Sequence, residues 1–233
     1  MINIEENLLS VREALDNSYQ VFGLEKTASA KVIAVSKRQN IEAITELLQA
    51  GQNVFGENRV QEAAEKWKDL RKTWPNIELH LIGPLQTNKV PDAVALFDMI
   101  QTVDRPKLAE ALVKEMKKIG KKVPCLIQIN TGEELQKSGI APQEADEFIT
   151  WCIDDIGLPV KGLMCIPPAD ELAAPHFALL SKIAKRHDLP ELSMGMSSDY
   201  TVAAAMGATF VRVGTAIFGP RQHVEENNNK VAG

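Results

Sequence analysis

Residues 31–36 read KVIAVS, a short β-branched run that is followed directly by a lysine, Lys37. Seven more such runs follow: NVFGE (53–57), ELHLIG (78–83), MIQTV (99–103), PCLIQIN (124–130), VKGLMCI (160–166), LSMGM (192–196) and FVRVG (210–214). Amphipathic stretches separate them, with apolar residues three and four positions apart, as at Ile41, Ile44 and Leu47. Eight strand and helix units within 233 residues predict an α/β protein, a single (β/α)8 TIM barrel of parallel strands.

Outside the eight units, the sequence predicts a leading helix and a tail. We expect residues 1–30 to hold that helix, over Glu5 to Phe22, and its connection to the barrel. The helix would cover the barrel bottom or take the place of the eighth helix. Residues 31–221 would form the barrel, and 222–233 a flexible tail. A doubly wound open sheet is the alternative, but eight strands and the lack of G-x-G-x-x-G after the first run disfavour it.

Composition excludes several classes of protein. The formal net charge is −5, which is not the basic excess of a general nucleic-acid surface. No apolar stretch reaches the roughly 20 residues of a membrane-spanning helix. Glu5 and Glu6 stand where a secretory signal would be basic. Three cysteines without C-x-x-C spacing indicate reduced core thiols, so we expect a cytoplasmic protein.

In such a barrel the active site lies where the strands end at their carboxyl side. Lys37 follows the first strand, and partial desolvation there would favour the neutral amine that attacks carbonyls. A Schiff-base role is therefore one interpretation of Lys37. The other is that its side chain extends into water or pairs with a carboxylate such as Glu57.

The last two strand ends predict an anion site. Ser197 and Ser198 end the seventh run before a helix, where hydroxyl and backbone N–H groups could bind phosphate. Taken alone, these residues could equally cap that helix. After the eighth run, Gly214 would let the backbone approach a ligand closely, and Thr215 adds a donor. Two adjacent strand ends with phosphate donors are a stronger indication than one.

Two charged or titratable residues lie inside apolar strands. Arg212 alternates with valines, so it should face the barrel interior, where a cation needs an acid partner or an anionic ligand. His80 lies between two leucines and is typical of a satisfied core histidine, although it could contact a bound ring. The four histidines have no metal-binding spacing. A lysine, a phosphate cradle and an inward arginine fit a sugar-phosphate aldolase or a pyridoxal phosphate site.

From about Val32 to Arg221, this chain resembles the pyridoxal phosphate homeostasis protein family in a series of motifs that occur in the same order. These are AVSK (34–37), FGEN (55–58), HLIGPLQTNK (80–89), KSG (137–139), GLM (162–164), GMSSD (195–199) and VRVGTAIFG (211–219). The resemblance implies the alanine racemase-like barrel of fold type III, with pyridoxal 5'-phosphate held as a Schiff base on Lys37.

The same resemblance implies roles for eight further residues. Ser197, Gly214 and Thr215 would hold the phosphate and Arg212 would face the pyridine nitrogen, while Asn58, His80 and Met164 would line the pocket and Lys137 would stand beside it. Ser198 is a further phosphate candidate from its place at the strand end. Arg38 follows Lys37 where many members have other residues, so the resemblance gives no expectation for this part of the entrance to the site. The tail beyond Arg221 also departs from the family pattern.

The implied function is pyridoxal phosphate binding for vitamin B6 homeostasis, without robust catalysis. Alanine racemases of this fold add a β domain and a second acid-base tyrosine, whereas here only Tyr19 and Tyr200 exist and the chain ends soon after the eighth strand. A weak amino-acid racemase is the alternative. Partners implied are the cofactor and the apo-enzymes that accept it, with neither nucleic acid nor membrane, and we expect a monomer.

Overall fold

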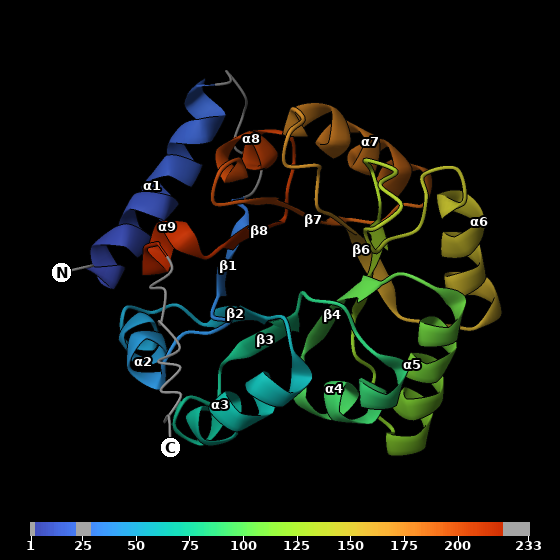
Figure 1. The fold of residues 1–233 in the computed structure, drawn as a ribbon, viewed down its shortest axis with the longest axis horizontal. Coiled ribbons are helices and arrows are strands. Elements are labelled where there is room, and N and C mark those ends of the chain that lie inside the picture. The colour runs from blue at the N-terminus through green and yellow to red at the C-terminus, as the bar shows by residue number, and fades with distance from the viewer. Residues whose placement is uncertain (1–2, 22–28, 221–233) are drawn as a thin grey trace, which may run out of the picture.

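Eight parallel strands close into a barrel in chain order, with β1 paired to both β2 and β8 (Figure 1). A computed structural model describes residues 3–21 and 29–220. The strands are β1 (Lys31–Val35), β2 (Val54–Glu57), β3 (Glu78–Leu81), β4 (Met99–Val103), β5 (Cys125–Ile129), β6 (Val160–Cys165), β7 (Glu191–Met196) and β8 (Phe210–Val213). Each predicted run agrees with its strand to within two residues at either end. The expected barrel is therefore confirmed, and the open sheet is wrong.

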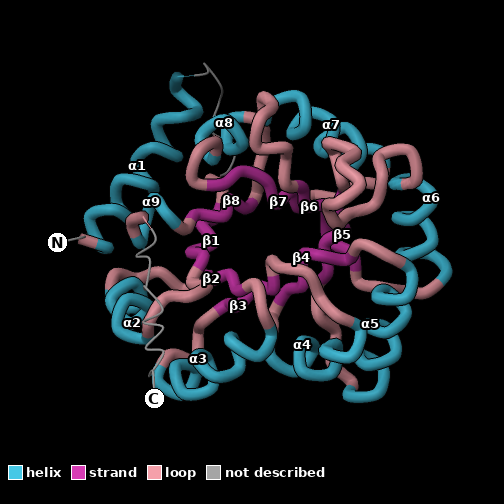
Figure 2. Tube along the Cα trace, in the orientation of Figure 1, coloured by secondary structure: helices cyan, strands magenta, loops and turns pink. Residues whose placement is uncertain are grey.

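Helices surround the barrel, as Figure 2 shows in cyan around the magenta strands. They are α1 (Ile4–Val21), α2 (Ile41–Gln49), α3 (Val60–Thr73), α4 (Val90–Leu96), α5 (Pro106–Ile119), α6 (Ala145–Thr150), α7 (Ala173–Arg186), α8 (Tyr200–Ala205) and α9 (Thr215–Phe218), with a 3-10 turn η1 (Thr87–Lys89) and a π-helical turn η2 (Trp151–Asp155). None of the helices within 3–21 and 29–220 is long and apolar enough to cross a membrane.

Alternation along each strand separates two cores. Outward strand residues pack against the helices in one large cluster, which includes Ala34, Leu79 and Val211. Inward residues form a smaller apolar cluster inside the barrel: Ile33, Val54, Met99, Leu126, Met164 and Phe210. Because successive side chains on a strand point to opposite faces, both clusters come from the same short runs. The barrel interior is thus filled by side chains and is not a pore.

Helix α1 takes the place of the helix that should follow β8. That helix is reduced to α9, which has only four residues. In its stead α1 packs against α8, α9 and α2, closing the outer ring at the left of Figure 1. Leu8 and Leu15 of α1 are buried in this contact. Of the two expected positions for the leading helix, the structure therefore has the eighth-helix place. Phe22, the expected end of that helix, and the tail 222–233 lie outside the described residues.

The turn after β7 depends on a glycine. Gly195 has φ +89°, and a Cβ built there would lie 2.5 Å from Ala203 Cβ of α8. Gly207, after α8, has φ +91° but would find nothing within 4 Å of such a Cβ. The two glycines thus share a left-handed backbone and differ in the space around them.

We expect Gly207→Ala to lower the free energy of unfolding by about 1 kcal/mol, since alanine is strained at positive φ. Gly195→Ala should cost about 1–3 kcal/mol more, because its methyl group also overlaps α8. Urea unfolding of both variants measures the difference. Equal losses would show that β7 and α8 can separate without cost at this point.

Candidate functional site

The residues singled out from the sequence gather at one end of the barrel. Strands that are all parallel present their carboxyl ends on the same side, so residues that follow different strands become neighbours. Residues within two positions of a strand end are Lys37 (β1), Asn58 (β2), Ser197 and Ser198 (β7), and Gly214 and Thr215 (β8), whereas Lys137 lies farther along the loop after β5. His80, Met164 and Arg212 lie within β3, β6 and β8, deeper in the barrel.

A buried ion pair between α3 and β2 fixes the turn that carries Lys37. Lys66 of α3 lies 2.7 Å from the carboxylate of Glu57 at the end of β2, with side-chain exposures of 11% and 0%. Ser36 Oγ donates to Glu57 Oε1 at 2.7 Å, and Lys66 Nζ donates to the Ser36 carbonyl at 2.8 Å. Trp67 Nε1 donates to the same Glu57 oxygen at 3.1 Å. Glu57 is therefore engaged by α3 and Ser36, and the half-buried Lys37 is the next residue along the chain.

The residue on the other side of Lys37 is also fixed by α3. Arg38 has φ +60°, an uncommon conformation for a residue with a side chain. Its backbone N–H donates to Glu62 Oε1 at 2.5 Å, and Lys66 donates to that oxygen at 2.9 Å. Burial raises the pKa of Glu62, but these two hydrogen bonds and the positive charges of Lys66 and Arg59 together hold the pKa below the ordinary value. Both neighbours of Lys37 are thus bonded to side chains of α3, directly or through Glu57 at the end of β2. We call Glu57, Glu62 and Lys66 together the α3 clamp.

Ser197 lies at the centre of a group of backbone donors. The N–H groups of Gly214 and Ala216 both donate to Ser197 Oγ, at 3.2 and 3.4 Å. Ser197 does not cap α8, which has no side-chain capping bond. Instead, Asp199 Oδ1 accepts the Met196 N–H at 2.6 Å and shapes the turn. With two N–H groups on its oxygen, the Ser197 hydroxyl has a proton left to donate to an anion.

Ser198 and Thr215 flank this group and are exposed. Each follows the strand end at which Ser197 or Gly214 lies, so their hydroxyls are on the same side of the barrel. The two strand ends therefore combine hydroxyl and amide donors without an acidic partner other than Asp199, whose carboxylate already accepts a backbone N–H.

Arg212 lies inside the barrel, as its alternation with valines predicted. It is 4% exposed. Its Nη1 donates to Ser193 Oγ and its Nη2 to the Cys165 carbonyl, both at 2.7 Å. Burial lowers the pKa of Arg212, but a guanidinium keeps its proton at neutral pH. Within 3–21 and 29–220 it makes no ion pair, so its direct partners are neutral.

His80 and Met164 form part of the interior below the mouth. His80 is fully buried, with its ring edge-on to Phe210 at 5.3 Å between centroids. Its Nε2 lies 2.8 Å from Glu78 Oε1, and its Nδ1 2.8 Å from Gln101 Nε2. Both ring nitrogens are thus bonded within the protein, as expected of a satisfied core histidine. Met164 belongs to the inward apolar cluster.

Lys137 lies in the loop after β5 and is ion-paired with Glu134. Its ammonium also approaches the Pro167 carbonyl, which follows β6, at 3.4 Å. Asn58 is half-buried and directly follows β2. These two residues therefore border the mouth from opposite parts of the barrel, and Glu134 neutralises the charge of Lys137 in this conformation.

Several residues that organise the site were not found from the sequence: Glu62, Lys66, Glu78, Gln101 and Ser193. Gln101 and Ser193 carry a usable signal, because each is a polar residue on the inward side of an apolar strand. Glu62 and Lys66 carry none, since charged residues on a helix normally face water.

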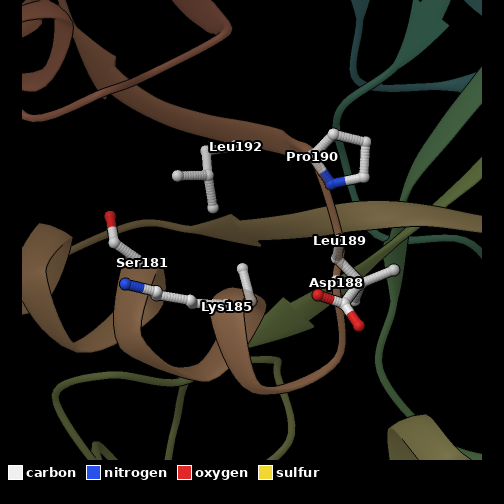
Figure 3. A pocket seen from close by; sticks show the side chains of 7 residues that line it. Ser181, Lys185, Asp188, Leu189, Pro190 and Leu192 are labelled. Carbon is white, nitrogen blue, oxygen red and sulfur yellow. The ribbon is translucent and has the colours of Figure 1, made fainter.

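The surface hollow in Figure 3 is separate from the mouth. It measures about 320 Å³ and lies between α7 and the start of β7, where Ser181, Lys185 and Leu192 line it. Because it adjoins the amino end of β7, it is remote from the strand ends that carry Ser197 and Gly214. In the described ranges, no group of three His, Cys, Asp or Glu side chains comes close enough together to hold a metal ion. Cys125, Cys152 and Cys165 are free and buried, and burial raises the pKa of Cys165 to about 12.

Comparison with known sequences gives a consistent result. A model of the family described as alanine racemase, N-terminal domain, matches residues 8–222. The chain is 38% identical over 232 residues to the pyridoxal phosphate homeostasis protein of Pasteurella multocida, covering 95% of this chain and 99% of that protein. It is 35% identical over 232 residues to the Escherichia coli protein of the same name, covering 96% and 99%.

Solved structures extend the likeness to the fold. PipY of Synechococcus elongatus, with PLP bound, superposes with a TM-score of 0.78 at 36% identity, covering 93% of this chain and 100% of that one. Alanine racemase of Clostridium difficile gives a TM-score of 0.72 at 17% identity, which shows a shared barrel fold. The match covers 94% of this chain but 57% of the racemase chain.

The α3 clamp makes a prediction about stability. Lys66→Met leaves the Glu57 carboxylate buried without its ammonium partner, and we expect a loss of about 3 kcal/mol in the free energy of unfolding. The double variant Glu57→Gln/Lys66→Met should recover much of this loss, because a neutral amide can still accept from Ser36 and Trp67. Lys68→Met, an exposed control on the same helix, should change stability by about 0.5 kcal/mol at most. Urea unfolding is the measurement, and a Lys66→Met loss equal to the control would contradict the clamp.

Proposed function

This chain belongs to the alanine racemase N-terminal domain family and, within it, to the pyridoxal phosphate homeostasis proteins, and on that premise we propose that it binds pyridoxal 5'-phosphate at the mouth of its barrel. Its role is the homeostasis of this form of vitamin B6. When bound, pyridoxal phosphate supplies an aldehyde that reacts reversibly with a primary amine, together with a phosphate and a pyridine nitrogen.

One observation carries the proposal. Arg212 is a buried cation without an ion-pair partner in the described residues, and it lies two positions before Gly214 on the strand that ends at the anion-binding group. A buried charge is costly unless something complements it. A ligand with an acceptor nitrogen toward Arg212 and a phosphate toward Ser197 complements both features at once. This donor set fits pyridoxal phosphate.

The remaining mouth residues have distinct tasks in this proposal. Lys37 supplies the amine, and the α3 clamp fixes the turn that presents it. Ser197 donates its free hydroxyl proton to the phosphate, with Gly214 supplying backbone contact. Ser198 and Thr215 add hydroxyl donors at the exposed edge.

The other expected contact residues lie away from the group of donors around Ser197. Asn58 borders the mouth and can contact the ring side of the ligand. Met164 and His80 form the floor, and His80 contributes apolar ring surface because both of its nitrogens are engaged. Lys137 would act at the rim, after release from Glu134.

The positions of the tyrosines support a binding role over racemisation. Racemisation needs a second acid-base group on the face of the ring opposite the lysine. Tyr19 OH accepts the backbone N–H of Ala30, just before β1 and hence at the amino end of the barrel. Tyr200 begins α8 and packs against the outer core, where burial raises the pKa of its hydroxyl. An arginine at the pyridine nitrogen also keeps that nitrogen unprotonated and weakens the ring as an electron sink.

The proposal extends to how the protein works in the cell. A reversible covalent link suits a carrier that holds the cofactor and yields it to apo-enzymes. We place this activity in the cytoplasm, with the barrel as a single functional unit and the monomer as the working state. The buried free thiols support a reducing compartment.

Borohydride trapping tests the binding site. Purified protein with pyridoxal phosphate should give, after reduction and peptide mapping, a pyridoxyl group on Lys37. Lys37→Ala should lose that product, whereas Lys31→Ala, at the other end of the same strand, should retain it. A wild-type protein without any adduct at Lys37 would overturn the proposed site.

Exchange of amino-acid α-protons tests the absence of robust catalysis. In deuterated water, the loaded protein should exchange the α-proton of alanine no faster than free pyridoxal phosphate at the same concentration. Turnover that continues over many equivalents and is lost in Lys37→Ala would favour the weak racemase instead.

A further inference from the structure

A continuous chain of hydrogen bonds crosses the barrel interior from the amino end of the barrel to Arg212. Glu78 begins β3 at the amino end of the barrel, and its side chain is 36% exposed. Its carboxylate bonds His80, His80 bonds Gln101, Gln101 bonds Ser193, and Ser193 bonds Arg212, at 2.8, 2.8, 2.6 and 2.7 Å. We call these five residues the interior relay. It links strands β3, β4, β7 and β8.

The two ends of the relay determine its direction. Arginine can only donate hydrogen bonds, and a carboxylate can only accept them. Arg212 therefore donates to Ser193, whose hydroxyl donates to the Gln101 oxygen, while the Gln101 amide donates to His80 Nδ1. His80 Nε2–H then donates to Glu78. Every donor points the same way, from the cation to the carboxylate.

This direction constrains the protonation of His80. A proton on Nδ1 would meet the amide N–H of Gln101, so the amide would have to turn around. Its N–H would then point at the Ser193 oxygen, which already accepts from Arg212, and the Ser193 hydroxyl would lose its acceptor. The unbroken relay thus requires neutral His80 with its proton on Nε2.

The two ends of the relay carry opposite charges, Arg212 and Glu78. Arg212 is buried without a carboxylate in contact. Asp199, after β7, acts on it through space and raises its pKa against the lowering by burial, whereas Glu78 is the carboxylate that is hydrogen-bonded into the relay. The hydrogen bond from His80 is the main cause that holds the pKa of Glu78 below its ordinary value, so Glu78 is an anion at neutral pH. Consecutive hydrogen bonds in a low-dielectric interior polarise one another. The Glu78 carboxylate can therefore act on the Arg212 guanidinium through these hydrogen bonds.

We propose that Glu78 is a positioning residue for the cofactor site, which orients Arg212 and supplies its remote counter-charge through the interior relay. This inference rests on the proposed pyridoxal phosphate site. It assigns a task to a residue that lies at the opposite end of the barrel from that site. The hydrogen bond from Arg212 Nη1 to Ser193 in the relay keeps the guanidinium oriented toward the ligand.

Glu78→Gln is the decisive variant, because it removes the charge but keeps the oxygen that accepts from His80. We expect a several-fold rise in the Kd for pyridoxal phosphate. The pH midpoint of the bound cofactor's absorption band should also shift. A charge acting only through space would have the opposite effect on Kd, since loss of an anion should tighten the binding of an anionic ligand. Glu191→Gln, at the first residue of β7 and outside the relay, is the matched control and should change neither quantity.

A double-variant cycle tests whether the effect passes through the relay. Gln101→Met breaks the chain midway with little change in volume. Adding Glu78→Gln to it should then produce no further change in Kd or midpoint. Additive effects would overturn the relay. Ser193→Ala is the substitute if Gln101→Met does not fold, as judged by circular dichroism.

The cofactor-free protein offers an independent measurement. Nitrogen-15 NMR should find His80 as the neutral Nε2–H tautomer, and a proton on Nδ1 would overturn the proposed direction. If wild type binds no pyridoxal phosphate, the proposed function fails. If wild type binds it and Glu78→Gln has the same or a lower Kd, the positioning role of Glu78 fails alone.

Discussion

Inside a closed barrel of eight strands there is room for side chains and for little else, so an inward polar group must find its partner among other inward groups. Arg212 places this constraint on the whole interior. Its hydrogen bonds reach β6 and β7 directly, at the Cys165 carbonyl and Ser193 Oγ, and the network continues to β4 and β3 through Gln101 and His80. Apolar residues fill the remaining inward space. One buried cation thus determines which strands must carry polar residues, and at which height.

The site is built at two levels that use different chemistry. At the carboxyl ends of the strands, short side chains are positioned by turns, as at Ser197, whose Oγ accepts the N–H of Gly214. Below the mouth, extended side chains bond one another across the barrel. Helix α3 supports the first level from outside, since Lys66 fixes the turn beside Lys37 through a carbonyl and a buried carboxylate. At β7 and β8, the backbone N–H groups of Gly214 and Ala216 in turn fix the position of the Ser197 hydroxyl.

Much of this organisation follows from local pattern. Alternation identified the strands and showed that Arg212 faces inward, because both depend on neighbours along the chain. Parallel pairing then gathered Lys37, Ser197 and Gly214 at one end. The partners of Arg212 depend instead on register, and Ser193 and Gln101 lie 92 positions apart. Irregularities between β4 and β5 and between β7 and β8 shift that register, and no sequence period indicates them. The α3 clamp was hidden for another reason, since Lys66 and Glu62 resemble ordinary solvated residues of a helix.

The substitution of α1 for the eighth helix has a consequence for how the chain folds during synthesis. Asn7 of α1 donates its side-chain amide to the carbonyl of Ile217, 210 positions later, and β1 pairs with β8 along the same seam. Helix α1 can pack against α2 early, but its contacts with α8 and α9 and the pairing of β1 with β8 form only after β8 has been synthesised. Vectorial synthesis can therefore assemble the middle of the barrel before this seam closes. A fold whose two ends meet has a high contact order, and its slow step is the joining of those ends.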